Sequence, residues 1–338
     1  MRRLKIAQVA APLLSVPPKT YGGTEKIVSF LTEGLVQRGH KVTLYASGDS
    51  VTKAKLKSVY PKYKMVWDNP LIQATNVDFA YEDADDFDII HNHAAHLGIA
   101  LAKKINTPVV TTLHNSYITP GTPEFSRYKD ACHYVAISKK QMQLLKGLKF
   151  GGVVYNAIDF TPFKFSKEKK DFYLFLGNIT RVKGPDIAVR IAKKMGIKLK
   201  FAGKMDVQER GFFEKEIKPF FDRKIEYLGM ISDKQKYELL GDAKALVFPL
   251  QWEEPFGLIM VEAMLSGTPV VAFHRGSVPE VVKHGKTGYV VRTMSDFMKA
   301  LRNVDKISPE DCRQWVESNF SIDKMVSGYE RVYDKILS

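Results

Sequence analysis

The stretch from Ala245 to Phe273, ALVFPLQWEEPFGLIMVEAMLSGTPVVAF, constrains the fold of this 338-residue chain more than any other segment. The apolar run Ala245–Phe248 predicts a buried strand, and the prolines and the glycine after it predict a loop. A helix is expected to begin near Gly257, and Gly267-Thr268-Pro269 ends it before a second apolar strand at Val270–Phe273. Strand, loop, helix and strand in this order are typical of a parallel α/β sheet.

Two acidic residues lie in this segment at positions that core packing does not require. Glu254 falls in the loop, and Glu262 lies about one turn inside the helix, whose core face is expected at Leu258, Val261 and Leu265. Ligands of parallel sheets bind beyond the carboxyl ends of the strands, where a helix N-terminus attracts phosphate. A carboxylate at Glu262 can accept two hydroxyl hydrogen bonds from a ribose. The alternative, a solvated loop glutamate and a helix-dipole glutamate, leaves the Pro-Phe-Gly loop unexplained.

A second strand-to-helix loop, in FLGNITRVKGPDIAV, carries two cations. A turn at Gly177 follows the strand, and the proline after the loop suits the first turn of a helix. Arg181 and Lys183 therefore lie in the loop, where fixed cations stabilise negative charge that develops on a diphosphate. Lys204, after the next strand, is a further candidate. The alternative for these residues is an ordinary solvated turn.

Strands alternate with helices twice along the chain, which predicts two parallel sheets with helices on both faces. The linker is expected between Ile158 and Lys170, so that the domains span 1–160 and 161–322. We expect strands at 4–10, 42–46, 88–90, 109–113, 172–176, 199–202, 225–228, 245–248 and 270–273, and helices at 25–38, 186–195 and 323–336.

The composition is that of a soluble protein with an anionic partner. No apolar run approaches the roughly 20 residues of a membrane span, and the N-terminus has no small-residue cleavage site, so a cytoplasmic location is expected. Cys132 and Cys312 are too few and too far apart for a disulfide framework. The net charge of +14 favours a nucleoside diphosphate, an acidic membrane surface or nucleic acid. No compact nucleic-acid-binding motif supports the last of these, so nucleic acid is not expected as a partner.

The densest basic stretch, TKAKLKSVYPKYK at 52–64, has two interpretations. It is either a solvated loop or a surface for the acceptor or for an acidic membrane. No amphipathic helix with a large apolar face accompanies the lysines, so the sequence leaves both open.

Two other groups of residues are open to a metal-binding interpretation. His91, His93 and His96 have the spacing His-x-His-x-x-His, which places two rings on one strand face, but a polar set in a cleft or core is preferred to a metal site. Asp86-Phe87-Asp88 precedes a strand instead of following one, as at a solvated strand entrance. We expect no essential metal and no cofactor.

These motifs, in their order, resemble those of the retaining nucleotide-sugar glycosyltransferases of family 4 (group 1), which have the GT-B fold. The resemblance covers nearly the whole chain and includes the segments YGGTE, YNAID, LGNITRVKG, EEPFGLIMVEAMLSGTPVVAF, GSVPEVVKHGKTGYVV and SIDKMVSGYERVY. It implies two Rossmann-like domains that face each other across a cleft, with a C-terminal helix at 323–338 packing back on the N-terminal domain. It also implies metal-independent transfer of a sugar from a nucleoside diphosphate sugar to a hydroxyl acceptor.

The resemblance implies roles for individual residues. It assigns catalysis to Glu254, Lys183, Arg181 and His114, and donor binding to Glu262, Gly22, Gly23, Phe256, Gly257, Leu258, Gly177 and Lys204. His114 is expected to contact the transferred sugar, and Glu254 the sugar or its developing positive charge. The family arginine normally follows the glycine directly, where this chain has Asn178, so Arg181 is the expected substitute. Two alternatives stay open, namely a nucleotide-sugar epimerase of the same fold and a noncatalytic nucleotide-sugar-binding protein.

Overall fold

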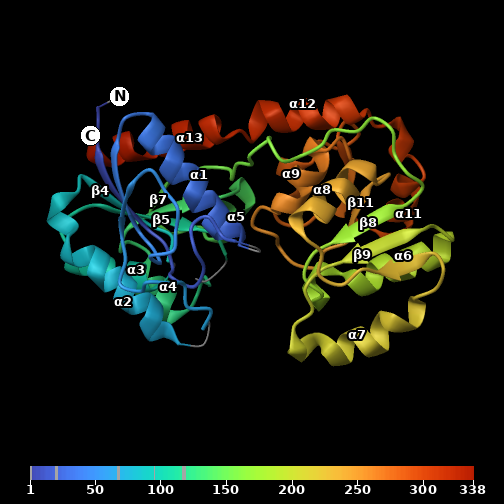
Figure 1. Ribbon diagram of the computed structural model, residues 1–338, viewed down its shortest axis with the longest axis horizontal. Coiled ribbons are helices and arrows are strands. Elements are labelled where there is room, and N and C mark those ends of the chain that lie inside the picture. Colours follow the sequence, from blue (N-terminus) through green and yellow to red (C-terminus); the bar gives the residue numbers. More distant parts are fainter. Residues whose placement is uncertain (1, 20–21, 67–68, 95, 116–118) are drawn as a thin grey trace. The chain divides into compact units, whose positions relative to one another are not determined.

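The computed structural model describes residues 2–19, 22–66, 69–94, 96–115 and 119–338, without the side chain of His96 (Figure 1). The chain divides into two compact units. The first comprises Met1–Ala157 and Ile322–Ser338, and the second comprises Ile158–Ser321. The first crossing between the units therefore falls at the start of the segment where the sequence predicts the linker.

The first unit is built on a seven-stranded parallel sheet in the order β3-β2-β1-β4-β5-β6-β7. The strands are β1 (Lys5–Val9), β2 (Lys41–Tyr45), β3 (Lys55–Lys57), β4 (Ile89–Asn92), β5 (Val109–Leu113), β6 (His133–Ala136) and β7 (Phe150–Val153). The helices are α1 (Gly23–Gln37), α2 (Pro70–Glu82), α3 (His96–Leu101), α4 (Pro123–Tyr128), α5 (Lys139–Leu144) and α13 (Ile322–Leu337), with short 3-10 turns η1 (Ala84–Asp86) and η2 (Ala102–Lys104).

The last helix, α13, belongs to this first unit and packs closely against it. A Cβ at Gly34 of α1 would lie 2.5 Å from Val326 Cγ2, and one at Gly328 would lie 2.9 Å from Val154 Cγ1. Such approaches are possible only where one partner lacks a side chain. Met325, Tyr329 and other residues on the same helix face are buried. The apolar spacing in the sequence thus corresponds to a packed helix face.

The second unit is built on a six-stranded parallel sheet in the order β10-β9-β8-β11-β12-β13. The strands are β8 (Tyr173–Leu176), β9 (Leu199–Ala202), β10 (Ile225–Tyr227), β11 (Leu246–Phe248), β12 (Val270–Phe273) and β13 (Gly288–Val291). The helices are α6 (Pro185–Met195), α7 (Arg210–Glu216), α8 (Asp233–Asp242), α9 (Leu258–Leu265), α10 (Val278–Val281), α11 (Met294–Leu301) and α12 (Pro309–Asn319), with 3-10 turns η3 (Arg181–Lys183), η4 (Val207–Glu209), η5 (Lys218–Phe220) and η6 (Val304–Lys306). Two parallel α/β sheets confirm the predicted fold class.

The core face predicted for α9 is only partly right. Leu258 is partly exposed, whereas Met260, Ala263 and Met264 are buried together with the predicted residues Val261 and Leu265. The helix contacts β12 on one side and α8 and α12 on others, so that it is covered nearly all round. A helix in such a position needs no polar face, which is why a one-sided spacing rule misplaces its core residues.

The strand order of each sheet reverses direction once. In the first unit the reversal lies between β1 and β4, and in the second it lies between β8 and β11. The connections that leave two such strands run to opposite sides of the sheet, and ligands of parallel α/β sheets bind beyond the carboxyl ends at this switch point. The loops after β8 and β11 carry half of the predicted site residues, and α9, which follows the second loop, carries two more.

Candidate functional site

The loops after β8 and β11 are fastened to each other at the switch point of the second unit. The backbone N–H of Gln251 donates to the carbonyl oxygen of Val182 at 2.7 Å. Gly184 caps α6 in a left-handed conformation (φ 72°), and a Cβ there would lie only 2.2 Å from the carbonyl oxygen of Pro249. Only glycine combines this backbone with so close an approach. The two loops therefore form one continuous support for the charged residues that they carry.

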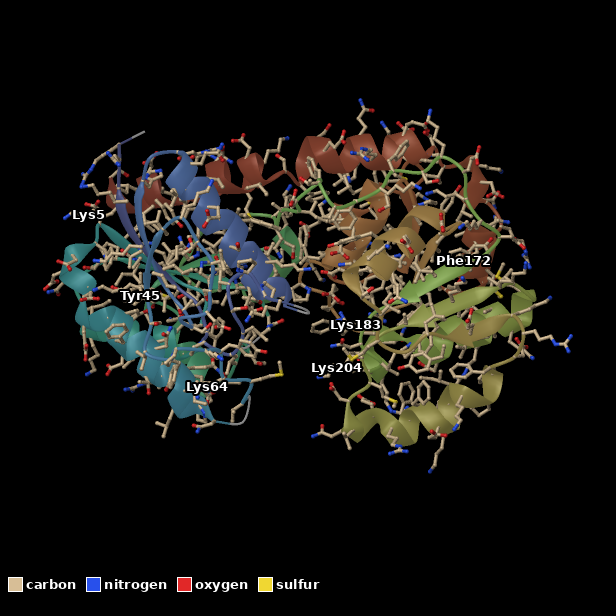
Figure 2. All side chains as sticks on the ribbon, viewed as in Figure 1. Lys5, Tyr45, Lys64, Phe172, Lys183 and Lys204 are labelled. Carbon is tan, nitrogen blue, oxygen red and sulfur yellow. The ribbon has the colours of Figure 1, made fainter. Side chains whose placement is uncertain are left out.

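This arrangement brings together two residues predicted from separate motifs, Lys183 and Glu254 (Figure 2 labels Lys183). Lys183 Nζ donates to Glu254 Oε2, and the indole N–H of Trp252 donates to the same oxygen at 3.0 Å. The Glu254 side chain is 9% exposed and that of Lys183 is 22% exposed. Lys183 Nζ also lies 4.9 Å from the centre of the Trp252 ring, where a cation is attracted by the ring face.

The loop after β12 fixes the backbone around Glu254. The N–H of Ser277 donates to the carbonyl oxygen of Glu254 at 2.8 Å, and Ser277 Oγ donates to that of Phe256 at 2.7 Å. The N–H of Gly276 donates to Glu253 Oε2 at 2.8 Å. A Cβ at Gly276 (φ 50°) would lie 2.2 Å from the Glu254 carbonyl oxygen. These contacts hold the Glu254 carboxylate in position without using its own oxygens.

Glu262 lies on α9, and its carboxylate is paired. Its Oε1 atom accepts from Lys236 Nζ of α8 at 2.9 Å, and its side chain is 14% exposed. Burial favours the neutral form of Lys236, but the attraction of Glu262 and of Asp233 outweighs it and raises the lysine pKa. A cation thus holds Glu262 in place and leaves its second oxygen outside this ion pair.

The remaining predicted residues of the strand-end loops are placed less centrally. The guanidinium of Arg181 stacks 4.3 Å from the centre of the Phe212 ring, and Lys204 Nζ pairs with Asp206 at 2.8 Å. The carbonyl oxygen of Gly177 would lie 1.7 Å from a Cβ at Gly203, so the two loops meet at glycines. Lys183 is therefore the only one of the three predicted cations that the described residues show in contact with Glu254.

The loop that leads into α9 differs in part from the predicted site. Gly257 caps the helix with φ 78°, and Leu258 is its first residue. The Phe256 side chain is 2% exposed and meets the ring of Phe320 edge-on at 5.7 Å. If Phe256 contacts the sugar donor as predicted, only its backbone atoms are placed to do so, because its side chain is buried.

In the first unit, the paired glycines lie at the start of α1. Gly22 is the N-cap, and Gly23 is the first helical residue. A Cβ at Gly22 would lie 2.7 Å from Pro18 Cβ, which accounts for glycine at this position. Glu25, in the first turn, is buried, and burial raises the pKa of its carboxyl group. Tyr21, the first residue of the glycine motif, lies outside the described residues.

His114 follows β5 and belongs to a largely buried chain of hydrogen bonds that reaches Gln8 of β1, at the other switch point. Its Nε2 atom lies 2.9 Å from His93 Nδ1, and His93 Nε2 lies 2.7 Å from Gln8 Oε1. His91 contacts the Tyr333 hydroxyl at 2.6 Å and the Thr112 hydroxyl at 2.7 Å.

Burial makes these rings neutral. Desolvation lowers the pKa of His114 to about 4 and lowers those of His91 and His93 well below the usual value. The rings of His91 and His93 have centres 4.0 Å apart, as expected for alternate residues of one strand. In the described part of the chain, no three His, Cys, Asp or Glu residues are placed to hold a metal ion. The Asp86-Phe87-Asp88 run ends in Asp88, which accepts from Arg2 and from the N–H of Lys5.

Two residues of the site escape prediction from the sequence. Trp252 touches both members of the Lys183–Glu254 pair, and Lys236 pairs with Glu262 from a different helix. The position of Trp252 inside the acidic loop is a local signal that could have been used. Lys236 carries none, because it comes from the helix before the motif and meets Glu262 only through packing. Over the residues described, no helix combines the length and the apolar character needed to cross a bilayer.

Comparisons with known proteins agree with this architecture. Residues 158–319 match the family described as Glycosyl transferases group 1, and residues 21–161 match Glycosyltransferase Family 4. The N-acetyl-alpha-D-glucosaminyl L-malate synthase of Bacillus anthracis is 26% identical and covers 94% of both chains.

Solved structures share the fold over nearly the whole chain. AviGT4, a glycosyltransferase involved in avilamycin A biosynthesis, matches with a TM-score of 0.77 and 24% identity over 99% of this chain and 98% of its own. Anabaena Alr3699/HepE, solved in complex with UDP-glucose, matches with a TM-score of 0.73 and 16% identity over 99% of both chains. The chain is a glycosyltransferase with the GT-B fold and belongs to the group 1 glycosyltransferases, family 4.

Proposed function

We propose that this glycosyltransferase moves a sugar from a nucleoside diphosphate sugar to a hydroxyl acceptor, with retention of the anomeric configuration and without a metal ion. The observation that carries the proposal is the meeting of Lys183 and Glu254 at the switch point between β8 and β11. A diphosphate donor needs a cation beside the phosphates and an acceptor of hydrogen bonds beside the sugar. This pair offers both from one rigid support.

Lys183 is proposed to stabilise the departing diphosphate. Cleavage of the bond between sugar and phosphate leaves additional negative charge on the nucleotide, and a fixed cation lowers the barrier where that charge develops. Arg181 is proposed to contribute at the same phosphates from the other end of the same 3-10 turn, η3. Positive charge supplied by side chains in this way is what supports transfer without a divalent metal.

Glu254 is proposed to act on the sugar, and Glu262 on the ribose. Glu254 is held by Trp252 and by the loop after β12, so it keeps its place when a phosphate competes for Lys183. Glu262 has an oxygen beyond its contact with Lys236 that can accept a ribose hydroxyl. The sugar contact of His114 and the phosphate contact of Gly22 and Gly23 stay predictions.

Retention is proposed to follow from a reaction on one face of the sugar. The acceptor hydroxyl forms the new glycosidic bond as the bond to the diphosphate breaks, and its proton passes to the departing phosphate oxygen. No protein base is needed in this scheme, which suits the low pKa of the neutral histidines in the first unit. The similarity in fold to Alr3699/HepE, which binds UDP-glucose, supports a nucleotide-sugar donor.

Thermal denaturation with UDP, GDP and ADP and their sugar derivatives, each with and without EDTA, tests the donor site. A ligand at 100 times its dissociation constant stabilises the folded state by about 2.7 kcal/mol, which is a readily measured shift. We expect one base to give a shift that survives EDTA. No shift with any nucleotide, or a shift abolished by EDTA, would contradict the proposed donor site. Once an acceptor is found, the anomeric proton coupling of the product tests retention.

A further inference from the structure

Residues 51–66, here called the basic strip, combine exposed cations with exposed apolar side chains. The strip contains Lys53, Lys55, Lys57, Lys62 and Lys64 and no acidic residue. Among the described residues, the large apolar side chains that are exposed include four from this strip, namely Val51 at 75%, Val59 at 37%, Met65 at 56% and Val66 at 42%. A segment that exposes both lysine and apolar side chains suits an interface between water and lipid.

Among the described residues, three carboxylates contact the strip, those of Glu33, Asp49 and Asp83, and they balance only part of the charge of its five lysines. Glu33 accepts from the backbone N–H of Lys53 at 3.0 Å and not from the lysine amino group. Of the five lysines in the strip, only Lys57 forms an ion pair with a described residue, namely with Asp83 at 2.6 Å. Another nearby acid, Asp49, pairs with Lys19 at 3.2 Å. The amino groups of Lys53, Lys55, Lys62 and Lys64 make no ion pair with any described residue and are free to meet external anions.

The strip is held as a fixed surface. β3 pairs with β2 at the edge of the sheet, and backbone hydrogen bonds of 2.8 Å fasten the strip on both sides of β3, one before the strand and two after it. The N–H of Lys64 donates to Pro12, that of Gly48 to Tyr60, and that of Val51 to Val16. A surface that is already ordered loses little conformational entropy on binding.

Lysines on an edge strand have a second explanation, because charge discourages pairing with another sheet edge. That explanation covers Lys55 and Lys57, the two lysines of β3. It does not cover Val51, Met65 and Val66, since exposed apolar residues beside an open edge promote the association that edge lysines prevent. The combination requires a partner that takes both kinds of side chain.

We propose that the basic strip docks the first unit on an anionic lipid bilayer. The four unpaired lysines contact lipid phosphates, and the apolar side chains enter the interface between headgroups and acyl chains. This proposal does not depend on the nature of the donor. It places the glycosyltransferase at a membrane surface, where an acceptor carried by a lipid would be within reach.

Sedimentation with vesicles at physiological salt tests the proposal on the full chain. The vesicles are phosphatidylcholine alone, and phosphatidylcholine with about one third phosphatidylglycerol. The strip variant carries Lys53→Ala, Lys55→Ala, Lys62→Ala and Lys64→Ala; Lys57 is kept because it pairs with Asp83. The control variant removes the same charge from the second unit by Lys215→Ala, Lys234→Ala, Lys299→Ala and Lys306→Ala, all exposed positions. Thermal denaturation checks that both variants are folded.

We expect the unchanged protein to bind the anionic vesicles, the strip variant to bind more than tenfold more weakly, and the control variant to bind less than threefold more weakly. A third variant, with Val51→Ser, Met65→Ser and Val66→Ser, keeps all charges and should bind at least threefold more weakly. Failure of the unchanged protein to bind, or equal losses in the strip and control variants, would overturn the proposal. So would a strip variant that loses binding to a uridine homopolymer while its binding to vesicles is unchanged.

Discussion

The two switch points of this glycosyltransferase occupy equivalent places in two parallel sheets but differ in chemistry. Beyond β8 and β11, the second unit presents ion pairs, Lys183 with Glu254 and Lys236 with Glu262. Beyond β1 and β4, the first unit presents neutral histidines that hydrogen bond to each other and to Gln8. At the switch point of the second unit, a diphosphate could take the place of the Glu254 carboxylate beside Lys183. At the switch point of the first unit, burial keeps the histidine network uncharged.

The difference shows that topology fixes where a ligand site lies but not what it binds. Both units satisfy the rule that ligands meet the carboxyl ends at a reversal of strand order. The chemistry comes from the loops, and from side chains such as Lys236 that other helices deliver. A charged site needs a counter-ion for each buried charge, whereas a neutral network needs only complete hydrogen bonding.

The largest effect that this comparison predicts is on catalysis by the charged site. Lys183→Met keeps the length of the side chain and removes its charge, and it should lower kcat/KM about a hundredfold, since one fixed donor at a developing anion contributes roughly that much. The measurement is initial rate against donor concentration. Lys198→Met is the control, because Lys198 is 57% exposed and pairs with Asp171 at the opposite end of β9. Equal rates for the two variants would show that the charged switch point is not the reaction centre.

The next effect concerns the contact between the loops after β8 and β11, which carry Lys183 and Glu254. Gly184→Ala should destabilise the fold by about 2 kcal/mol or more, because its left-handed backbone is strained with a side chain and the new Cβ would overlap the carbonyl oxygen of Pro249. Urea denaturation measures the change. Gly211→Ala is the control, since a Cβ at Gly211 of α7 would meet no atom within 4 Å. A loss no larger than the control would mean that the two loops are not rigidly joined.

The neutral switch point should reveal itself through pH. A histidine whose folded pKa is lowered binds fewer protons when folded than when unfolded, so the protein gains stability as pH rises from the folded value to about 6.5 and keeps it above that. For His114 the window runs from about 4 to about 6.5. For each buried histidine, the free energy of unfolding should therefore fall by about 1.4 kcal/mol for each pH unit below 6.5.

Urea denaturation at pH 7.5 and 5.5 measures this dependence. His91→Asn should lose about 1.4 kcal/mol less than the unchanged protein between the two values, because one neutral ring is absent. Val207→Asn, at a position of the second unit that is 88% exposed, changes no titratable group and should lose as much as the unchanged protein. If the two variants lose equal free energies of unfolding between pH 7.5 and 5.5, the first unit does not hold His91 neutral, and the proposed difference between the switch points is wrong.

The sequence predicted the positions of these regions better than their contacts. β5, β9 and β12 have the predicted bounds, because short apolar runs between turn residues leave little choice. The residues next to Lys183 and Glu254 in the sequence were also enough to place both of them in loops. Their ion pair could not, because it depends on Gly184 fitting under Pro249, a contact between segments far apart in the chain.

The same reasoning explains the incorrect part of the prediction. Leu258 fits a helical spacing but lies at the helix start, where the neighbours of α9 do not cover it. Spacing along one helix describes a single stripe, and it holds no information about how many sides other elements will cover. The side chain of Phe256 likewise turns into the core against Phe320, which the order of residues in its loop does not show.

The smallest effect sharpens the comparison within the charged site, by separating nucleotide binding from catalysis. Glu262→Ala should weaken nucleoside diphosphate binding about fivefold, which is the loss of roughly one charge-assisted hydrogen bond, while kcat changes less than KM. Isothermal titration and steady-state kinetics measure the two effects. Glu238→Ala removes an exposed carboxylate from α8 and is the control. If Glu262→Ala instead lowers kcat as strongly as Lys183→Met does, Glu262 contributes to the transition state, and the charged switch point is one catalytic unit instead of a catalytic pair beside a nucleotide anchor.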